Sequence, residues 1–339
     1  MPLRLLEFMI PEKETERLHR LLEEQPALGV WLTSSAGGGA MVRILLDAQH
    51  VEALSDMLID NFGGGTDFRM VLMPVEATLP RIEEPEEKQK EKEEESGAKE
   101  KPQPRISRDE LYEDLDHAGR LTLVYAIMVA VSALVAAVGL IRSDVAIIIG
   151  AMVIAPLLGP NVALSLGCTL GDPGLVKRSL IALGVGIAIA AAISIIIGLV
   201  LKIDVSSPQI AARTQIGFGS IIVALATGTA GSLAFTTGIP AVLVGVMVAV
   251  ALLPPLVAGG LLAGAGLWGP AGGALTLLII NITCINLAAV ATFLVQKVRP
   301  RTWWEEERAR KATRIAVATW VIMLAVLVGV IVLKHVGIL

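Results

Sequence analysis

The chain of 339 residues has few cysteines, histidines and aromatic residues. These shortages argue against a disulfide-rich protein, a metalloprotein and a nucleic-acid-binding protein. Its two cysteines, Cys168 and Cys284, both lie in apolar segments, so a disulfide framework and a metal cluster are disfavoured and small packing residues are expected. The histidines show no ligand spacing and are His19, His50, His117 and His335. We therefore expect no metal site and no cofactor.

Charged residues are also scarce in one long region. Residues 119–296 hold only a handful of ionisable side chains, whereas residues 1–118 have an ordinary share, and this shift predicts a domain boundary. The composition is 54% hydrophobic with a mean hydropathy of +0.70, which is too apolar for a soluble protein of this size. The net charge is −4, and no basic face carries interleaved aromatic residues, so no nucleic-acid partner is expected.

Residues 1–80 combine strand and helix patterns. Runs rich in strand formers at 3–10, 27–33, 41–47 and 68–77 are separated by leucines at helical spacing in "PEKETERLHRLLEEQ" and "HVEALSDMLIDNF". The order βαββαβ predicts a small α+β domain of the ferredoxin-like type in the cytoplasm, and such domains serve oligomerisation, ligand sensing or neither. The glycines at 37–39 and 63–65 fit turns, and contact with a ligand is the alternative.

A charged segment separates this domain from the apolar region. Residues 81–105 contain nine acidic and seven basic side chains with almost nothing to bury, which predicts a flexible linker. Residues 106–119 then predict an amphipathic helix at the membrane surface, because Ser107 precedes Glu110 by three residues, the spacing of a capping box.

About 20 mostly apolar residues are needed to cross a bilayer as a helix. Seven stretches meet this length, at 120–141, 145–170, 178–201, 216–237, 240–266, 272–296 and 314–335. The N-terminus lacks a secretory signal, and the basic residues gather in alternate loops, above all in the loop at 297–314. The positive-inside rule then predicts a multi-pass protein of the cell inner (cytoplasmic) membrane, with a cytoplasmic N-terminus and the C-terminus outside.

One Pro-containing phrase occurs twice in the apolar region. "GAMVIAPLLGP" at 150–160 and "GVMVAVALLPP" at 245–255 belong to segments with eleven identities in twenty-five aligned positions at an offset of ninety-five residues. This predicts two three-helix repeats, residues 120–211 and 212–298, the second inverted because three spans are an odd number. Residues 299–339 form a basic cytoplasmic loop and a seventh transmembrane helix outside the repeats.

The prolines predict an interruption in the second span and in the fifth. Proline removes a backbone donor and frees a carbonyl one turn earlier, which membranes tolerate where protein or water meets it. Interrupted helices at matching places in inverted repeats are typical of secondary transporters. Kinks that serve packing alone are the alternative. The candidate pathway residues are Pro156, Gly159, Pro160, Asn161, Pro254, Pro255, Asn281, Asn286, Thr236 and Thr237.

All the polar candidates are neutral, and they could equally hydrogen-bond between helices. The interiors of the first six spans contain no Asp, Glu, Lys, Arg or His, since Arg142 and Asp144 lie at a span boundary. Proton-coupled carriers generally need an intramembrane titrating group, so a proton exchanger is disfavoured. A solute or ion would be held by backbone groups, helix ends and neutral side chains.

Four long phrases carry a resemblance to a known family. "RISRDELYEDLDHAGRLTLVY", "IGAMVIAPLLGPN", "LAFTTGIPAVLVGVMVAVALLPPLV" and "INLAAVATFLVQKVRPRTWWE" resemble the prokaryotic membrane family named domain of unknown function 389, over residues 107 to about 310. The N-terminal domain also resembles the version that such proteins often carry. The resemblance implies a multi-span prokaryotic membrane protein and supplies no catalytic residues.

Two functions follow from these patterns. The first is a transporter or channel for an unidentified ion or small solute, with the N-terminal domain regulating or assembling it. The alternative is a membrane-anchored sensor or scaffold whose cytoplasmic domain binds a ligand or partner. No nucleophile, base and orienting residue stand in a recognisable arrangement, so we expect no enzyme. The lipid bilayer and further copies of the chain, in a homo-oligomer, are the expected partners.

Overall fold

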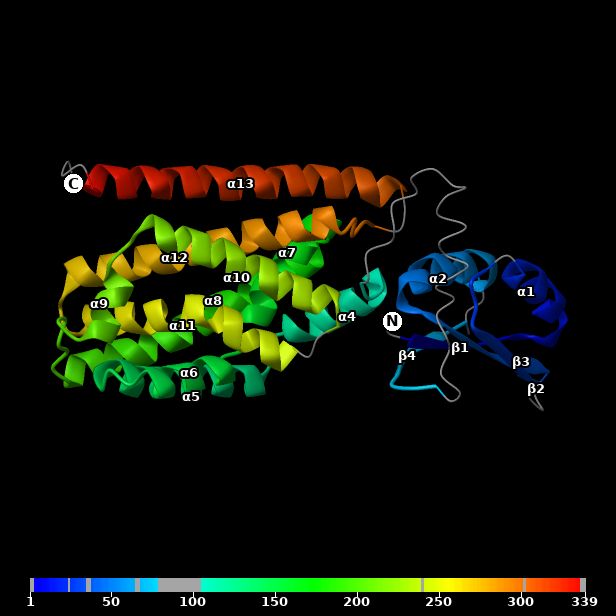
Figure 1. The fold of residues 1–339 in the computed structure, drawn as a ribbon, viewed down its shortest axis with the longest axis horizontal. Coiled ribbons are helices and arrows are strands. Elements are labelled where there is room, and N and C mark those ends of the chain that lie inside the picture. The colour runs from blue at the N-terminus through cyan, green and yellow to red at the C-terminus, as the bar shows by residue number, and fades with distance from the viewer. Residues whose placement is uncertain are drawn as a thin grey trace, which may run out of the picture. The chain divides into compact units, whose positions relative to one another are not determined.

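The computed structural model describes residues 3–23, 25–34, 38–64, 68–78, 105–238, 241–300 and 303–335, and its elements are labelled in Figure 1. The chain divides into two compact units, Met1–Glu110 and Leu111–Leu339. We call them the α/β unit and the helical unit. Most of the predicted linker, residues 81–104, lies outside the described residues.

The α/β unit contains a four-stranded antiparallel sheet with strand order β2-β3-β1-β4. Along the chain the elements are β1 (Leu3–Pro11), the 3₁₀ turn η1 (Glu12–Glu14), α1 (Thr15–Leu22), β2 (Gly29–Ser34), β3 (Gly39–Asp47), α2 (Ala48–Phe62) and β4 (Met70–Val75). The predicted strands and helices are thus confirmed in kind and order. Asp47 begins α2 as its N-cap, accepting the Gln49 N–H at 3.2 Å.

Alternation along the strands builds the core of this unit. Leu6, Phe8 and Ile10 are buried on β1, while Met9 between them is 48% exposed. The buried strand residues pack with Leu18 of α1 and Leu58 of α2 in one hydrophobic cluster. Neither α1 nor α2 covers the other face of the sheet, on which Met9 lies.

Residues 105–110 belong to the α/β unit through three ion pairs. Arg105 contacts Glu52 at 2.7 Å, and Arg108 contacts Asp56 at 3.1 Å. The Ser107 hydroxyl accepts the Glu110 N–H at 3.2 Å, which confirms the predicted N-cap of α4 (Arg108–Ala118). The Glu110 carboxylate binds Arg4 at 2.8 Å.

The helical unit is made of apolar helices that lie side by side (Figure 1). After α4 come α5 (Leu123–Ile141), α6 (Val145–Ile154), α7 (Leu158–Leu170), α8 (Pro173–Val200), α9 (Pro208–Thr214), α10 (Phe218–Thr236), α11 (Ala241–Gly264), α12 (Trp268–Val295) and α13 (Trp303–His335). Polar residues mark the helix starts: Thr122, Asp144 and Asp172 accept backbone N–H groups of the first turns of α5, α6 and α8.

Small residues allow α8 and α11 to pack at close distance. A Cβ at Gly198 would lie 2.1 Å from the Leu261 carbonyl oxygen, and one at Gly264 would lie 2.2 Å from the Ile195 carbonyl oxygen. No side chain larger than hydrogen fits at these positions unless the helices separate. Such small-residue contacts are a common way for helices to associate in membranes, where the hydrophobic effect between helices is absent.

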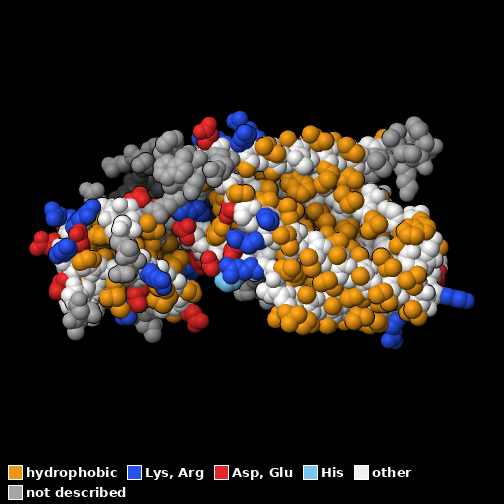
Figure 2. Space-filling view, turned by 180° about the vertical axis from the view of Figure 1, so that it is seen from behind, with side chains coloured by type: hydrophobic (Ala, Val, Ile, Leu, Met, Phe, Trp, Pro, Cys, Tyr) orange, Lys and Arg blue, Asp and Glu red, His pale blue; other side chains and the backbone are white. Residues whose placement is uncertain are grey.

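The surface of the helical unit is apolar over a broad band. Figure 2 shows hydrophobic side chains across its middle, with charged side chains gathered at its ends. Leu123, Leu199 and Val200 are 77%, 70% and 78% exposed, an arrangement that is unfavourable in water and favourable in lipid. Among the described residues, five helices are long and apolar enough to cross a membrane, or six if α6 and α7 form one span. Apolar α11 lies beside them.

Candidate functional site

The second predicted span is interrupted where its prolines lie. Helix α6 ends at Ile154, α7 begins at Leu158, and the two helices meet at 50°. Pro156 stands in the gap, where it cannot donate a backbone hydrogen bond, and Pro160 occupies the first turn of α7, where no intrahelical donor is needed. The predicted interruption at Pro156 is confirmed.

The start of α7 lies inside the helical unit. No side chain caps this N-terminus, which is the positive end of the helix dipole. A Cβ at Gly159 would lie 2.6 Å from the carbonyl oxygen of Ala118, so only glycine permits this approach of α4 to α7. Leu115 and Asp116, which precede Ala118 on α4, are buried as well.

One turn into α7, Asn161 takes part in a buried amide cluster with α12. The Asn286 side-chain amide donates to the Asn161 side-chain oxygen, and the Ser165 hydroxyl donates to the Asn286 oxygen at 2.8 Å. All three residues are fully buried. The Asn161 side-chain nitrogen has no hydrogen-bond partner among the described residues. A buried unpaired donor is costly, which makes this amide a candidate contact for a polar ligand.

A second amide of α12 contacts α11. The Asn281 side-chain nitrogen donates to the Ala251 carbonyl oxygen at 2.6 Å. Both Pro254 and Pro255 lie inside α11, which continues as a helix through them. The predicted interruption of the fifth span is therefore wrong, because Asn281 supplies the donor that Pro255 lacks.

The remaining candidates lie apart from this cluster. Thr236 and Thr237, at the end of α10, donate to the Leu233 carbonyl of their own helix, each at 2.9 Å. Thr236 is buried and Thr237 is exposed. Of the candidates, the structure thus joins Asn161 to Asn286 directly and places Asn281 against α11 beside Pro255.

Sequence reasoning missed a charged network between α4 and α8. Asp116 is buried and contacts Arg178 at 2.7 Å and the Nε of Arg120 at 2.9 Å. The Tyr112 hydroxyl donates to Asp172 at 2.6 Å. The sequence does show an Asp-Pro-Gly start for α8 and an Asp116/Arg120 spacing that allows an ion pair within α4. Neither pattern predicts that α4 contacts α8.

Two groups of this network lie outside the apolar spans and have shifted pKa values. Burial raises the pKa of Asp172, but the hydrogen bonds from Tyr112 and from the Leu175 and Gly174 N–H groups outweigh it and lower the pKa below its ordinary value. Burial raises the pKa of Tyr112, and its hydrogen bond to Asp172 raises it further. Asp172 is thus held as a carboxylate and Tyr112 as a neutral hydroxyl.

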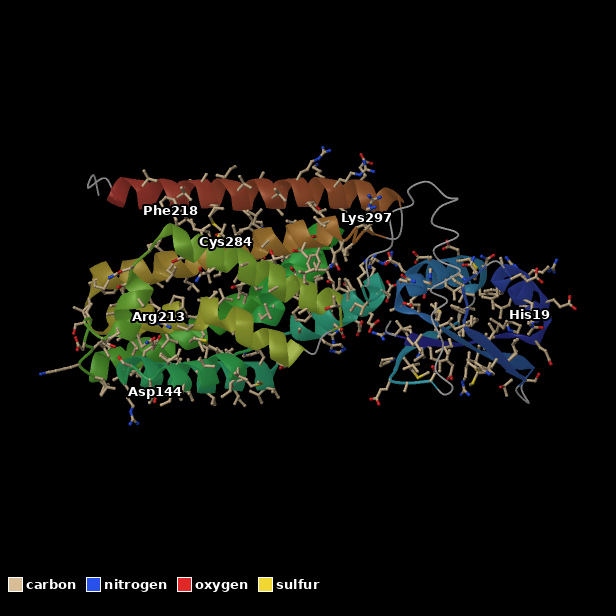
Figure 3. All side chains as sticks on the ribbon, viewed as in Figure 1. His19, Asp144, Arg213, Phe218, Cys284 and Lys297 are labelled. Carbon is tan, nitrogen blue, oxygen red and sulfur yellow. The ribbon has the colours of Figure 1, made fainter. Side chains whose placement is uncertain are left out.

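Metal ligands are not grouped in the described part of the chain. No set of three His, Cys, Asp or Glu side chains there could hold a metal ion. Cys168 and Cys284 are free thiols on α7 and α12, and Figure 3 labels Cys284 within the helical unit.

These features define a multi-pass helical membrane protein with a small α/β unit at its N-terminus. The family model described as "Domain of unknown function (DUF389)" matches residues 152–287, a range that contains the interruption between α6 and α7 and both amide contacts. The "Uncharacterized protein MJ0678" of Methanocaldococcus jannaschii is 37% identical over 336 residues, covering 99% of this chain and 100% of that protein. The chain belongs to the DUF389 family. No solved structure matches it.

Proposed function

We propose that this protein is a transporter or channel for a small solute or ion, with its pathway closed at the Asn161–Asn286 contact. The observation that carries the proposal is the interrupted second span, where the α7 N-terminus without a side-chain cap and the unpaired side-chain nitrogen of Asn161 lie inside the helical unit. Uncapped helix ends within an apolar unit are a recurring means of binding ions and polar solutes near the bilayer midplane. The bound species is held without an ionisable side chain of the spans.

Helix contacts support an inverted repeat of two three-helix units, α5 to α8 and α10 to α12. At an offset of ninety-five residues, α8 is equivalent to α12 and α11 is equivalent to α6 and α7. Helix α8 packs on α11, and correspondingly α12 packs on α7. With α13 added, the proposal has seven spans, a cytoplasmic N-terminus and an outside C-terminus in the inner membrane.

The proposed opening step separates α7 from α12. Asn161 and Asn286 close the site in the described conformation, and the residues 155–157 between α6 and α7 provide the hinge. Loss of either amide removes the hydrogen bond between Asn161 and Asn286 that closes the site, and one such bond corresponds to about a tenfold change in an equilibrium or rate. The protein acts on the solute without covalent chemistry, so no enzymatic activity is proposed.

Flux through liposomes tests this function. Purified protein should move at least one species from a broad panel of ions and small solutes, and Asn161→Ala and Asn286→Ala should each change the rate about tenfold. Ser232→Ala is the matched control, since Ser232 is equally buried but bonds only to carbonyls of its own helix. Wild-type protein that moves no member of the panel, with and without a membrane potential, would overturn the proposal.

A sensor or scaffold is the second candidate, and the open face of the α/β sheet favours it. We infer a ferredoxin-like domain from the βαββαβ order and the strand order β2-β3-β1-β4. Met9, Trp31 and Val71 are 48%, 52% and 51% exposed, which suits contact with a ligand, a partner or a second copy of the chain. Deleting residues 1–105 discriminates the two functions, because a transporter keeps basal flux and a sensor loses its cellular phenotype.

A further inference from the structure

A cavity of about 830 Å³ lies between α7, α12 and α13. Thr169 at the end of α7 and Leu294 near the end of α12 form one side, and α13 forms the other. The Thr313 hydroxyl of α13 donates to the carbonyls of Cys168 and Thr169 at 3.2 and 3.3 Å, which holds α13 against α7. Lys297, labelled in Figure 3, marks this end of α12.

Three arginines line this cavity, Arg299, Arg310 and Arg314, and no acidic residue belongs to its described lining. All three arginines are exposed. Within the described part of the chain, Arg299 and Arg314 have no hydrogen-bond or ion-pair partner. A guanidinium group can donate two parallel N–H···O hydrogen bonds to two oxygens of one phosphate. This end of the cavity therefore attracts an anion.

The rest of the cavity is apolar and extends along α13. Val317 and Val321 follow Arg310 and Arg314 on the same stripe of the helix, about one and two turns further into the apolar window Ala309–Gly329. Leu294 and Val321 are 48% and 47% exposed, so this part is open to the lipid side. An inorganic anion would use only the arginines, whereas an amphiphile would use the apolar part as well.

We propose that this cavity binds one anionic phospholipid, with its phosphate on Arg299, Arg310 and Arg314 and an acyl chain along Val317, Val321 and Leu294. Basic pockets at helix ends on the cytoplasmic side are suited to such headgroups. The site holds the long, little-buried α13 on α7 and α12 through a shared ligand. The proposed lipid site requires that these helices lie in a membrane, and it does not depend on the proposed transport function.

Native mass spectrometry of the full chain in detergent tests the site. Wild-type protein should retain added phosphatidylglycerol more tightly than phosphatidylcholine. Arg299→Gln with Arg314→Gln should weaken phosphatidylglycerol binding roughly thirtyfold, the loss expected for two cationic side chains at a lipid surface. The control is Arg142→Gln with Lys202→Gln, which removes the same charge from two exposed residues elsewhere in the helical unit. Equal effects of the two double variants would overturn the proposal.

A third variant separates a lipid from a free anion. Val317→Trp fills the apolar part and keeps every arginine, so it should weaken phosphatidylglycerol binding. Added inorganic phosphate should compete poorly with the lipid. Phosphatidylglycerol binding that is unchanged by Val317→Trp, or that millimolar phosphate abolishes, would show an anion site without an acyl-chain contact and would overturn the proposal.

Discussion

Asn281 on α12 donates its side-chain amide to the main-chain carbonyl of Ala251 on α11. Ala251 precedes Pro255 by four residues, so its carbonyl is the one that Pro255 leaves without an intrahelical donor. The 2.6 Å contact replaces the missing N–H inside an apolar unit. Helix α11 continues through two prolines, and this bond replaces the donor that one of them lacks and ties α12 to α11.

Replacing Asn281 by Leu should destabilise the protein by about 1 kcal/mol, because the Ala251 carbonyl would lose the hydrogen bond that the Asn281 amide donates to it. Thermal unfolding in detergent measures this. Pro255→Ala is the partner mutation, since it restores a backbone N–H to the same carbonyl. In the Pro255→Ala background the loss caused by Asn281→Leu should shrink, and an equal loss in both backgrounds would contradict this account.

The contact of α8 with α11 should tolerate no side chain at Gly198. Gly198→Ala places a Cβ 2.1 Å from the Leu261 carbonyl oxygen and should destabilise the protein by about 1–3 kcal/mol in detergent unfolding. Gly184→Ala is the control on the same helix, because a Cβ there has no neighbour within 4 Å. Alanine is the better helix former, so this control should be neutral or up to about 1 kcal/mol more stable. A Gly198 variant as stable as the control would refute the close packing.

Acid should weaken the attachment of α4 to α8 through Asp172. The pKa of Asp172 is lowered in the folded protein, so its carboxylate stabilises the fold above the unfolded pKa, about 3.9, and this contribution is lost as the pH falls through the folded value. Unfolding measured from pH 7 to pH 3 should therefore depend less on pH in Asp172→Asn. Tyr112→Phe should reproduce part of this reduced pH dependence, because it removes one hydrogen bond to Asp172. A pH profile of unfolding that is unaltered in both variants would contradict a stabilising role for the Asp172 carboxylate.

Asp116 should be the most sensitive charged residue of α4. Its carboxylate is 5% exposed between Arg120 and Arg178, whose side chains are each 49% exposed. Asp116→Asn should cost about 1–2 kcal/mol of unfolding free energy, less than a fully buried pair because water screens both arginines. Glu113→Gln, on the same helix with a side chain 64% exposed, should be nearly neutral. Equal stability of the two variants would show that the network is not structural.

Pattern alone predicted much of this protein, and the two Pro-containing phrases show its limit. Pro160 and Pro255 are equivalent in the repeat alignment, but Pro156 is opposite Ala251. In the second repeat Pro255 frees the carbonyl of Ala251, and the first repeat has Pro156 at the position equivalent to Ala251. At Pro156 the chain leaves the helix. At the same offset, Asn281 is opposite Gly186, so only the second repeat has an amide that can replace the lost donor.

The sequence by itself determined the α/β order of the N-terminal unit, the apolar helices and the interruption at Pro156, because periodicity, apolar length and proline act locally. Only the tertiary structure decided that α11 is continuous, that Asn161 and Asn286 meet, and that Tyr112, Asp116, Asp172 and Arg178 form one network. Each of these depends on which residues of distant helices face each other. That choice is made by the packing of whole helices and has no local signal in the chain.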